Sequence, residues 1–538
     1  MYYTTTIRKG QPYARILDFL SCKYYYIRCD FFTKAVGFGL KYRSTRGNSS
    51  YVEFSEAVIE GIAPDGGLYV PAEKVTFTDD EQMIMSTLSY GELAKRIIRR
   101  YAGDFTDEQI DECVKNAYCP GRFYGHPAPV KTLSDTLNVL ELWHGPTAAF
   151  KDLALQILPE FMKKSLENTG VKEKIVILTA TSGDTGKAAL EGFKNANGID
   201  VIVFYPKDGV SRMQELQMVT QEGSNVHVAS VIGNFDDAQT GVKKIFGDAD
   251  YNAKLAAHGI RLSSANSINF GRLLPQIVYY FHAYYELVRR GEISFGEKIN
   301  FTVPTGNFGN ILACYYAAKS GLPVNRIICA SNDNKVLADF FATKTYDTHR
   351  EFLTTISPAM DILISSNFER LLFDASGRAS TAVVNMMNSL RENGSYEVES
   401  DIFDNISNYF WSSYATEEET KETIKNVYNE FGYLVDPHTA VGLTVYDKYV
   451  ISSGDTTKTV AVSTASPFKF NASVAEAIFG KENVEGKNEF EILDLLSEKT
   501  GLPVPEPLRD IDKKEILHKT VCRPEDMPET VGGFLCSK

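Results

Sequence analysis

Lys151 is the residue whose type and position most strongly indicate chemistry in this chain. It lies in the sequence HGPTAAFKD at 144–152, after an apolar, strand-like run at 139–142 and within a pattern that predicts an amphipathic helix at 148–164. A lysine near a helix N-terminus and partly shielded from water can act as an amine nucleophile or form a Schiff base with a carbonyl cofactor, because its ammonium form is disfavoured. Position alone favours the ordinary alternative, in which the side chain extends into water.

A second informative loop has the sequence TATSGDTGK at 179–187. It lies between a predicted strand at 175–178 and a helix that begins near Lys187. Its glycines allow close backbone approach, and its polar side chains lie at a helix N-terminus, where anionic ligands are held. Those polar side chains belong to Ser182, Asp184 and Thr185. A plain strand-to-helix turn with an Asp or Thr cap is the structural alternative.

The same loop shares only part of the pattern of a nucleotide-binding P-loop. That motif has a glycine five residues before its Gly-Lys pair, and Thr181 occupies this place. Ala188 also stands where the motif needs Ser or Thr. We therefore exclude a P-loop.

A third loop, PTGNFGN at 304–310, lies between a predicted strand at 300–303 and a predicted helix at 311–319. Two glycines and two asparagines at a helix start form a cradle of backbone N–H groups that suits an anion. The phosphate of a permanently bound cofactor would fit such a cradle. Alone, the loop is equally consistent with an ordinary turn.

A fourth loop, STASPFKF at 463–470, follows the predicted strand 459–462. A hydroxyl at the end of this strand could face a ring nitrogen, which a hydroxyl would leave largely unprotonated and a carboxylate would not. The alternative is a Ser or Thr cap, with Pro467 opening the next helix.

Strand-like and helix-like segments alternate along most of the chain, and this alternation predicts where the four loops lie in the fold. The strand-like runs lie at 175–178, 201–204, 300–303, 327–330 and 460–462. Such alternation predicts an α/β fold of parallel strands covered by helices on both faces. In that architecture ligands bind beyond the carboxyl ends of the strands. The four loops are therefore expected to lie together.

The composition sets the class of protein. The chain has 538 residues, 43% of them hydrophobic, and a formal net charge of −13, which argues against nucleic acid or an anionic membrane as a partner. The eight cysteines include no CxxC pair and no metal-ligand spacing with histidine, so we expect no metal. No apolar run reaches the length of a membrane span, and we expect a soluble, cytoplasmic protein.

Three regions are expected along the chain. Residues 1–40 are basic and rich in aromatics, and we interpret them as a nonessential extension or the product of a wrongly assigned start codon. Residues 41–130, with the turn APDGG at 63–67, predict a small N-terminal domain. Residues 131–538 carry the alternating strands and helices.

Taken together, these loops resemble the motifs of threonine synthases of the longer type found in fungi and many bacteria, members of the tryptophan-synthase-like, fold type II group of pyridoxal-phosphate enzymes. The resemblance covers roughly residue 42 to the C-terminus. The matching segments, in family order, are 42–48, 63–71, 144–156, 181–187, 264–276, 304–310, 436–442 and 463–470. The resemblance implies an α/β fold of two parallel-sheet lobes covered by helices, in which 131–538 form the pyridoxal-phosphate-dependent catalytic region.

The resemblance also implies roles for individual residues. Lys151 would bind pyridoxal 5'-phosphate as a Schiff base and would be the catalytic residue. Thr464 would face the pyridine nitrogen, and Asp184 would lie at the cofactor 3'-oxygen. The cofactor phosphate would be held by Gly306, Asn307, Phe308, Gly309 and Asn310. The substrate would be bound by Ser182, Thr185, Ser267, Asn269 and Arg272. Arg272 is the best phosphate ligand on physical grounds, because a guanidinium can grip a phosphate with two parallel hydrogen bonds; the alternative for it is a surface salt bridge.

Two positions depart from the family pattern. Ser466 stands where many members have His, and Phe468 stands where they have Ala. The hydroxyl of Thr464 is retained, so we expect cofactor binding to be kept and the packing around the substrate to change. His438 fits a family motif as well, but an Asp cap followed by Pro at the first helical position explains much of it, and we leave His438 out of the catalytic set.

The reaction that the resemblance implies is the last step of threonine biosynthesis. Phosphate is eliminated from O-phospho-L-homoserine, and water is added to give L-threonine. The alternatives are a phospholyase that turns the same substrate into 2-oxobutyrate and a noncatalytic, regulatory relative. We expect a small-molecule substrate, no nucleic-acid or membrane partner, and a monomer or small homo-oligomer.

Overall fold

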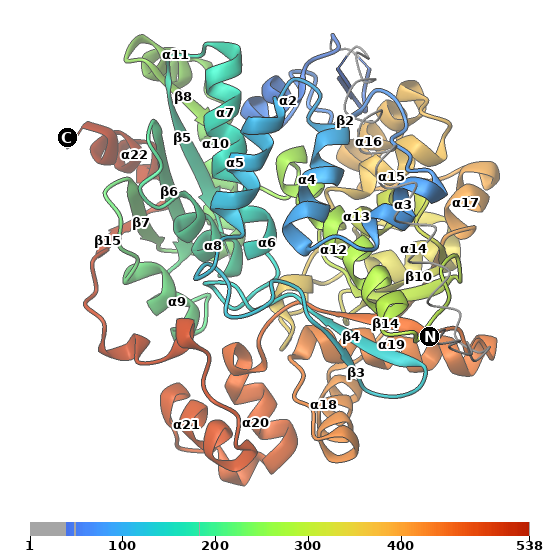
Figure 1. Ribbon diagram of the computed structural model, residues 1–538. Helices are drawn as coiled ribbons and strands as arrows, with labels where there is room; N and C mark the ends of the chain where they lie inside the picture. Colours follow the sequence, from blue (N-terminus) through green and yellow to red (C-terminus); the bar gives the residue numbers. More distant parts are fainter. Residues whose placement is uncertain (1–38, 48–49, 182, 537–538) are drawn as a thin grey trace, which may run out of the picture. The chain divides into compact units, whose positions relative to one another are not determined.

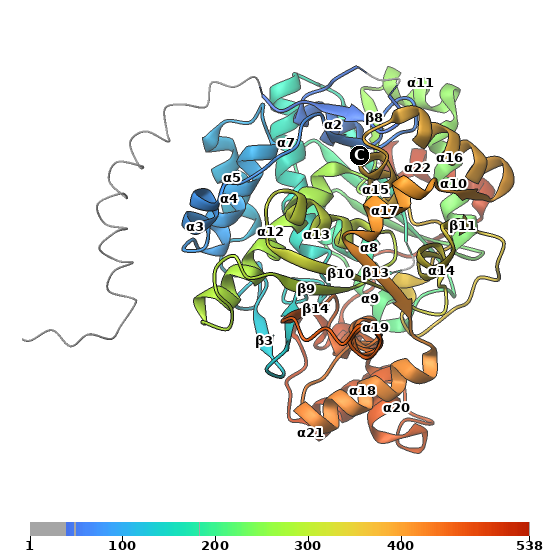
Figure 2. The ribbon, with the colours of Figure 1, turned by 90° about the vertical axis from the view of Figure 1, so that its right-hand side faces the viewer.

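The computed structural model describes residues 39–47, 50–181 and 183–536. Leu40–Lys538 form one compact unit, and its elements are labelled in Figures 1 and 2. The expected extension at 1–40 lies almost entirely outside the described residues. Within the described part of the chain, no helix is long and apolar enough to cross a membrane.

A five-stranded parallel sheet has the strand order β15-β7-β6-β5-β8. Its strands are β5 (Lys174–Ala180), β6 (Ile199–Pro206), β7 (Val226–Val231), β8 (Ile260–Ser263) and β15 (Thr520–Cys522). Successive side chains of a strand point to opposite faces. Ile175 and Ile177 of β5 therefore join the main core, whereas Val176 and Leu178 join a second core. That second core includes residues of α10 (Phe235–Gly247) and α22 (Met527–Cys536). Both faces of β5 are buried, which explains its continuous apolar run.

A six-stranded sheet has the order β13-β10-β9-β14-β4-β3. All its pairs are parallel except β3 with β4. Its strands are β3 (Val130–Thr132), β4 (Leu137–Glu141), β9 (Ile299–Pro304), β10 (Val324–Ser331), β13 (Phe410–Tyr414) and β14 (Thr459–Ser463). Helices α13 (Gly309–Lys319), α14 (Val336–Thr343) and α19 (Pro437–Ser453) pack against it. Figure 2 shows β9, β10 and β13 side by side with these helices around them.

The N-terminal part of the described chain is built from a strand pair and short helices. β1 (Tyr42–Ser44) and β2 (Tyr69–Pro71) pair antiparallel. The helices that follow are α2 (Phe54–Glu60), α3 (Asp79–Met85), α4 (Tyr90–Tyr101) and α5 (Asp107–Ala117). Helices α2 and α5 contact α7 (Leu158–Thr169), and α4 contacts α12 (Phe270–Arg289). The boundary that we propose near residue 130 coincides with the start of β3.

The remaining elements lie around the two sheets. The strands β11 (Thr345–Asp347) and β12 (Ser395–Glu397) pair antiparallel. The other helices are α8 (Asp184–Phe193), α9 (Arg212–Val219), α11 (Ala249–Ala257), α15 (Phe368–Ala375), α16 (Ser380–Asn393), α17 (Ser400–Ser407), α18 (Glu417–Phe431), α20 (Asn471–Phe479) and α21 (Glu489–Thr500). In Figure 1 the orange and red helices α18, α20 and α21 lie together at the bottom of the view.

The helix expected at 148–164 is divided in two. It begins at Asp152 as the short α6 (Asp152–Leu155) and resumes as α7 at Leu158. The late start has a local cause, because Ala148 has a left-handed φ of 57°. The break coincides with Pro159, which lacks the N–H that a continuous helix would donate to the carbonyl of Leu155. Lys151 is thus the residue directly before α6, between the loop and the helix.

The tight approach of α8 to α6 predicts an intolerant glycine. A Cβ on Gly192 would lie 2.0 Å from the carbonyl oxygen of Leu155. We expect Gly192→Ala to lower the free energy of unfolding by roughly 1–3 kcal/mol through overpacking, measured from urea denaturation midpoints. Gly91→Ala in α4 is the control, because its Cβ would first meet Val114 Cγ1 at 3.9 Å. Equal effects of the two substitutions would contradict this packing.

Candidate active site

The loops expected to carry chemistry begin at one edge of the six-stranded sheet. β14 lies between β4 and β9, with Ser463 opposite Glu141 and Ala461 opposite Thr302. Because these three strands are parallel, the loops after their carboxyl ends start side by side. They are the loops 142–151, 305–308 and 464–466. The fourth loop, 181–183, leaves β5 of the other sheet and leads into α8.

The loop before Lys151 is tied to the loop after β14. The N–H of Phe150 donates to the carbonyl of Thr464 at 2.8 Å, and the N–H of Ser466 donates to the carbonyl of Ala148 at 3.1 Å. The same loop is closed on itself by Asp152, whose carboxylate accepts bonds from the N–H and the hydroxyl of Thr147 at 2.8 and 2.7 Å. Burial raises the pKa of Asp152 to about 6, although the two bonds from Thr147 oppose the rise. These contacts hold Lys151 next to Thr464 in the fold.

Asp184 connects the two sheets through ion pairs with two lysines. Its Oδ2 lies 3.5 Å from Lys151 Nζ, and its Oδ1 lies 2.8 Å from Lys469 Nζ. Burial alone would raise the pKa of the Asp184 carboxyl, but the charges of Lys469 and Lys151 hold it well below its usual range. Asp184 is therefore ionised at neutral pH.

Of the two lysines, Lys151 is the one free to react. Its side chain is 11% exposed and has the long contact to Asp184, whereas that of Lys469 is fully buried. Lys469 Nζ also donates to the carbonyl of Thr147 at 3.0 Å. Burial lowers the pKa of Lys151, and the charges of Lys469 and Arg272 add to this against the opposing effect of Asp184. A lowered pKa is the property that an amine nucleophile needs.

The loop 305–308, in which the phosphate cradle is predicted, leads into α13. Phe308 has a left-handed φ of 62°, which turns the chain into the helix. Gly306 is required by close approach, because a Cβ there would lie 2.5 Å from the carbonyl oxygen of Ala359. Asn310 is buried and accepts bonds from the hydroxyls of Tyr279 and Tyr280 at 2.5 and 2.7 Å. Its Nδ2 is buried without a hydrogen-bond partner in the described part of the chain.

These observations fit a phosphate-bearing aldehyde cofactor. The unpartnered amide of Asn310 and the N–H groups at the start of α13 offer donors to a phosphate, and no side chain at Gly306 fills the space. Lys151 offers an amine to an aldehyde. Among the described residues, no group of three or more His, Cys, Asp or Glu side chains could hold a metal ion.

Three more residues have predicted roles: Thr464 at the cofactor, and Ser182 and Thr185 at the substrate. Thr464 is buried and directly follows β14. Thr185 is half-buried in the first turn of α8. Ser182 lies outside the described residues. The roles predicted for these three residues stay predictions.

Arg272 is a buried cation near the start of α12. Its Nη1 donates to the carbonyl of Ala265 at 2.8 Å, and its Nε is buried without a partner in the described structure. No carboxylate of the described residues forms an ion pair with it. Burial lowers the pKa of Arg272 to about 10, so it stays protonated at neutral pH. A charged guanidinium without a carboxylate partner suits an anionic ligand. The structure therefore does not favour the surface salt bridge considered for it above.

Asn269 and Ser267 differ in how many of their side-chain hydrogen-bonding groups already have partners. Asn269 caps α12, with its Oδ1 accepting from the N–H of Gly271 at 2.9 Å and its Nδ2 donating to the carbonyl of Val58 at 2.9 Å. Ser267 Oγ accepts one bond from Asn367 Nδ2 at 3.3 Å. A bond from Asn269 to substrate would need its present bonds to change, whereas Ser267 keeps a donor available.

Arg370 and Asn367 connect the predicted cofactor and substrate loops, and the sequence motifs did not reveal either residue. Arg370 is fully buried and donates to the carbonyls of Tyr69 and Ile268 at 3.0 and 2.6 Å, and to Asn367 Oδ1 at 2.5 Å. Asn367 Nδ2 donates to the carbonyl of Asn307 at 2.9 Å as well as to Ser267. One amide thus joins the cradle loop to the loop before α12.

His438, left out of the catalytic set, bonds the residue against which the loop 305–308 packs. Its Nδ1 lies 2.7 Å from Asp436 Oδ1, and its Nε2 accepts a bond from the N–H of Ala359 at 3.1 Å. Nδ1 therefore carries the proton. Because Ala359 is the residue against which Gly306 packs, His438 has a positioning role.

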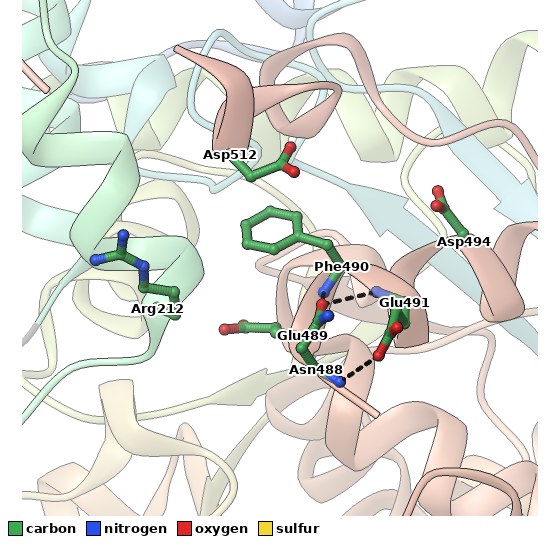
Figure 3. Close-up of a pocket in the computed structure, with 7 residues that line it drawn as sticks. All are labelled: Arg212, Asn488, Glu489, Phe490, Glu491, Asp494 and Asp512. Atoms are coloured by element: carbon green, nitrogen blue, oxygen red, sulfur yellow. Dashed lines mark hydrogen bonds between the residues drawn. The ribbon is translucent and has the colours of Figure 1, made fainter. Parts of the chain in front are cut away.

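A separate cavity of about 540 Å³ lies between the N-termini of α9 and α21. Figure 3 shows Arg212 on one side and the residues of α21 on the other. Its lining consists of Arg212, Asn488, Glu489, Phe490, Glu491, Asp494 and Asp512. Four carboxylates and one arginine do not suit an anionic substrate, and none of the residues predicted for the site lines this cavity.

Three family models match the chain. Residues 128–464 match the family described as pyridoxal-phosphate dependent enzyme, which defines the class of protein. Residues 41–118 match threonine synthase N terminus, and residues 439–519 match threonine synthase, C-terminal.

Similar proteins and a solved structure agree with these matches. Threonine synthase of Saccharomyces cerevisiae is 38% identical over 473 residues, which cover 82% of this chain and 90% of the yeast protein. Threonine synthase-like 1 of Macaca fascicularis is 40% identical over 441 residues, but this chain spans only 58% of its length. The crystal structure of threonine synthase with bound pyridoxal phosphate from Brucella melitensis is 36% identical, covers 93% of this chain and 100% of its own, and has a TM-score of 0.81.

The chain belongs to the threonine synthase family of pyridoxal-phosphate-dependent enzymes. This confirms the family, the fold class and the cofactor expected from the sequence. The assignment of single residues to that cofactor stays a prediction, and it rests on the geometry described above.

Lys151→Ala tests the central residue. We expect the purified variant to lose the visible absorption of cofactor joined to lysine and to lose activity by about 10³-fold or more, because no other amine is free at this place. Lys164→Ala is the matched control, since that side chain is 13% exposed, close to the 11% of Lys151. An unchanged visible band in Lys151→Ala would reject the assignment.

Proposed function

We propose that this protein catalyses the threonine synthase reaction, in which O-phospho-L-homoserine and water give L-threonine and phosphate. The observation that carries the proposal is Arg272, a buried cation whose Nε has no partner in the described structure. It supports an anionic group on the substrate, distinct from the cofactor phosphate at the start of α13. Membership of the threonine synthase family supports the choice of substrate.

The substrate phosphate is proposed to bind at the start of α12. Arg272 supplies the positive charge and Ser267 a hydroxyl, while Asn269 keeps the helix start in place. Arg370 and Asn367 hold this loop at a fixed distance from the cradle loop. Two phosphate sites held by one bridge would fix the length of the molecule that joins them, which favours a γ-phosphate over a shorter substrate.

The reaction requires protons to leave the α- and β-carbons before phosphate leaves the γ-carbon. Bound pyridoxal phosphate supplies an electron sink for the negative charge that develops on these carbons. Lys151 Nζ, as a neutral amine, is proposed to take those two protons and to return one to the γ-carbon and one to the α-carbon, while water supplies the hydroxyl at the β-carbon and its remaining proton leaves with the phosphate. Asp184 stays ionised beside Lys151 and orients the amine.

Water must be admitted late and in one position. The side chains around Lys151 are buried, with Thr464 and Asp184 each 7% exposed. Such enclosure disfavours early hydrolysis while the intermediate is held. A phospholyase that releases 2-oxobutyrate would keep Lys151 and the cradle, and no feature of this structure favours it over threonine formation.

We also propose a cytoplasmic location and a monomer or small homo-oligomer. The cysteines Cys113, Cys119, Cys314, Cys329 and Cys522 are free. Free thiols are typical of reducing compartments, which supports the location.

Product analysis tests the reaction. Incubation of the protein with O-phosphohomoserine is expected to give threonine and inorganic phosphate in equal amounts, because each turnover breaks one ester bond and adds one water. Amino-acid analysis and a phosphate assay on the same samples provide the ratio. Release of phosphate with ammonia and 2-oxobutyrate, and no threonine, would replace the proposal by the phospholyase.

Arg272→Met tests the substrate phosphate site. Loss of one partner of a buried charge contact costs about 2–5 kcal/mol, so kcat/KM should fall by roughly 30-fold to 4,000-fold, mainly through KM. Inhibition by inorganic phosphate should weaken in parallel, while the cofactor absorbance stays unchanged. Arg261→Met is the control, because that arginine is 39% exposed and has a long, 3.9 Å contact with Glu60. A normal KM in Arg272→Met would exclude the role.

A further inference from the structure

Two lysines share one buried carboxylate beside the strand-end loops. Asp184 Oδ1 lies 2.8 Å from Lys469 Nζ and accepts a bond from Gln214 Nε2 at 3.1 Å. Its other oxygen lies 3.5 Å from Lys151 Nζ. The stronger contact of the carboxylate therefore goes to Lys469, which is not the lysine expected to bond the cofactor.

Two acceptors hold the ammonium group of Lys469 in place, the carboxylate of Asp184 and the carbonyl of Thr147. Lys469 Nζ donates to the carbonyl of Thr147 at 3.0 Å, and Thr147 is itself fixed by two bonds to Asp152. The side chain of Lys469 is fully buried. A buried ammonium that is paired with a carboxylate and a carbonyl is a permanent part of the site.

Among Asp184, Lys469 and Lys151, the charges balance only when Lys151 is neutral; the nearby Arg272 and Asp152 carry opposite charges and leave this balance unchanged. Lys469 and Asp184 then cancel, whereas a protonated Lys151 would add a second positive charge near Arg272 in a buried place. An unbalanced charge in such surroundings is costly. Without Lys469, Asp184 would pair with Lys151 alone, and that pair would favour the charged form of Lys151.

We propose that Lys469 is a positioning residue that takes up the charge of Asp184 and thereby leaves the amine of Lys151 available to the cofactor. The proposal deepens the function proposed above and rests on it for the role of Lys151. Nothing in the sequence pattern assigned this lysine a role, because its partner lies in the other sheet's loop.

Three other titratable groups lie near Asp184, Lys151 and Lys469. Arg272 of α12 opposes the charge on Lys151. His438 of α19 also lies near Asp184, but its Nε2 accepts a bond from the N–H of Ala359, so its ring is neutral. Asp152 of α6 faces Lys469, which lowers the pKa of that carboxyl against its burial. These groups stay unchanged in the variants below.

The experiment compares Lys469→Met and Lys469→Gln with Gln214→Met in the full-length holoenzyme. Both lysine variants remove the charge, and Lys469→Gln keeps a donor for Asp184 in case the Met variant does not fold. Gln214→Met removes a neutral bond to the same oxygen, Asp184 Oδ1. The readout is the pH dependence of the visible absorption of the bound cofactor, which follows the protonation of the nitrogen shared with Lys151.

We expect the titration in both lysine variants to move to higher pH by about one unit or more, because a nearby positive charge no longer opposes protonation. Gln214→Met should move it by less than about 0.3 unit. Equal shifts for Lys469→Met and Gln214→Met, or no shift in either lysine variant, would overturn the proposal.

A second readout separates this inference from the proposed function. In the full-length protein freed of cofactor, acetic anhydride labelling of Lys151 as a function of pH, read by peptide mass spectrometry, reports the free amine directly. In the wild type, the pKa of Lys151 should lie below that of the surface lysine Lys95. Both Lys469 variants should raise the pKa of Lys151. If Lys151 titrates like Lys95 in the wild type, the proposal fails without any variant. If this test succeeds but Lys151→Ala keeps the visible band, only the proposed function fails.

Discussion

The parallel pairing of β14 with its two neighbours is the constraint on which the site depends. Since β4, β14 and β9 run in one direction, the lysine loop, the Thr464 loop and the cradle loop all emerge at the same edge. The backbone bonds from Phe150 to Thr464 and from Ser466 to Ala148 then hold the first two of these loops at a fixed distance. The order of the strands in the sheet, rather than their order in the sequence, brings the cofactor groups together.

Buried charges are the second theme of the site, and each has a reason to be tolerated. Asp184 is balanced by lysines and Arg370 by carbonyls and an amide, so both are satisfied within the protein. Arg272 and the amide of Asn310 retain unpartnered atoms among the described residues. Buried polar atoms normally find partners. Other buried polar atoms of the described residues also lack a partner, but these two lie where the substrate and cofactor phosphates are proposed to bind, and a bound anion would satisfy them.

The sequence was sufficient for the framework of the fold, because the central strands are buried on both faces and therefore read as continuous apolar runs. It was insufficient for β7, β8, β13 and β15. Strand β7 is interrupted by His227, β8 is mostly half-buried with Arg261, β13 has the sequence FWSSY, and two of the three residues of β15 are exposed. Short or polar strands of this kind are defined by their neighbours, which a local pattern does not contain.

The residues of the site divide in the same way, into those that a local pattern predicts and those that it does not. Lys151 and the cradle could be predicted because each lies in a local strand, loop and helix pattern. Lys469 lay in a recognised motif without a role, and Arg370 and Asn367 lay in no motif, because what defines all three is a partner distant in sequence. The predicted helix at 148–164 was wrong in its first residues for a related reason, since Ala148 and Phe150 bond to the loop after β14 rather than to their own helix.

The bond from Arg370 to the carbonyl of Tyr69 couples the N-terminal strand pair to the site. Tyr69 belongs to β2, and the same guanidinium donates to Asn367 and to the carbonyl of Ile268. Opening of the β1–β2 pair would remove one acceptor from a buried cation, which is costly. Because Asn367 also bonds the carbonyl of Asn307, local unfolding of the N-terminal segment is expected to loosen the loop before α13.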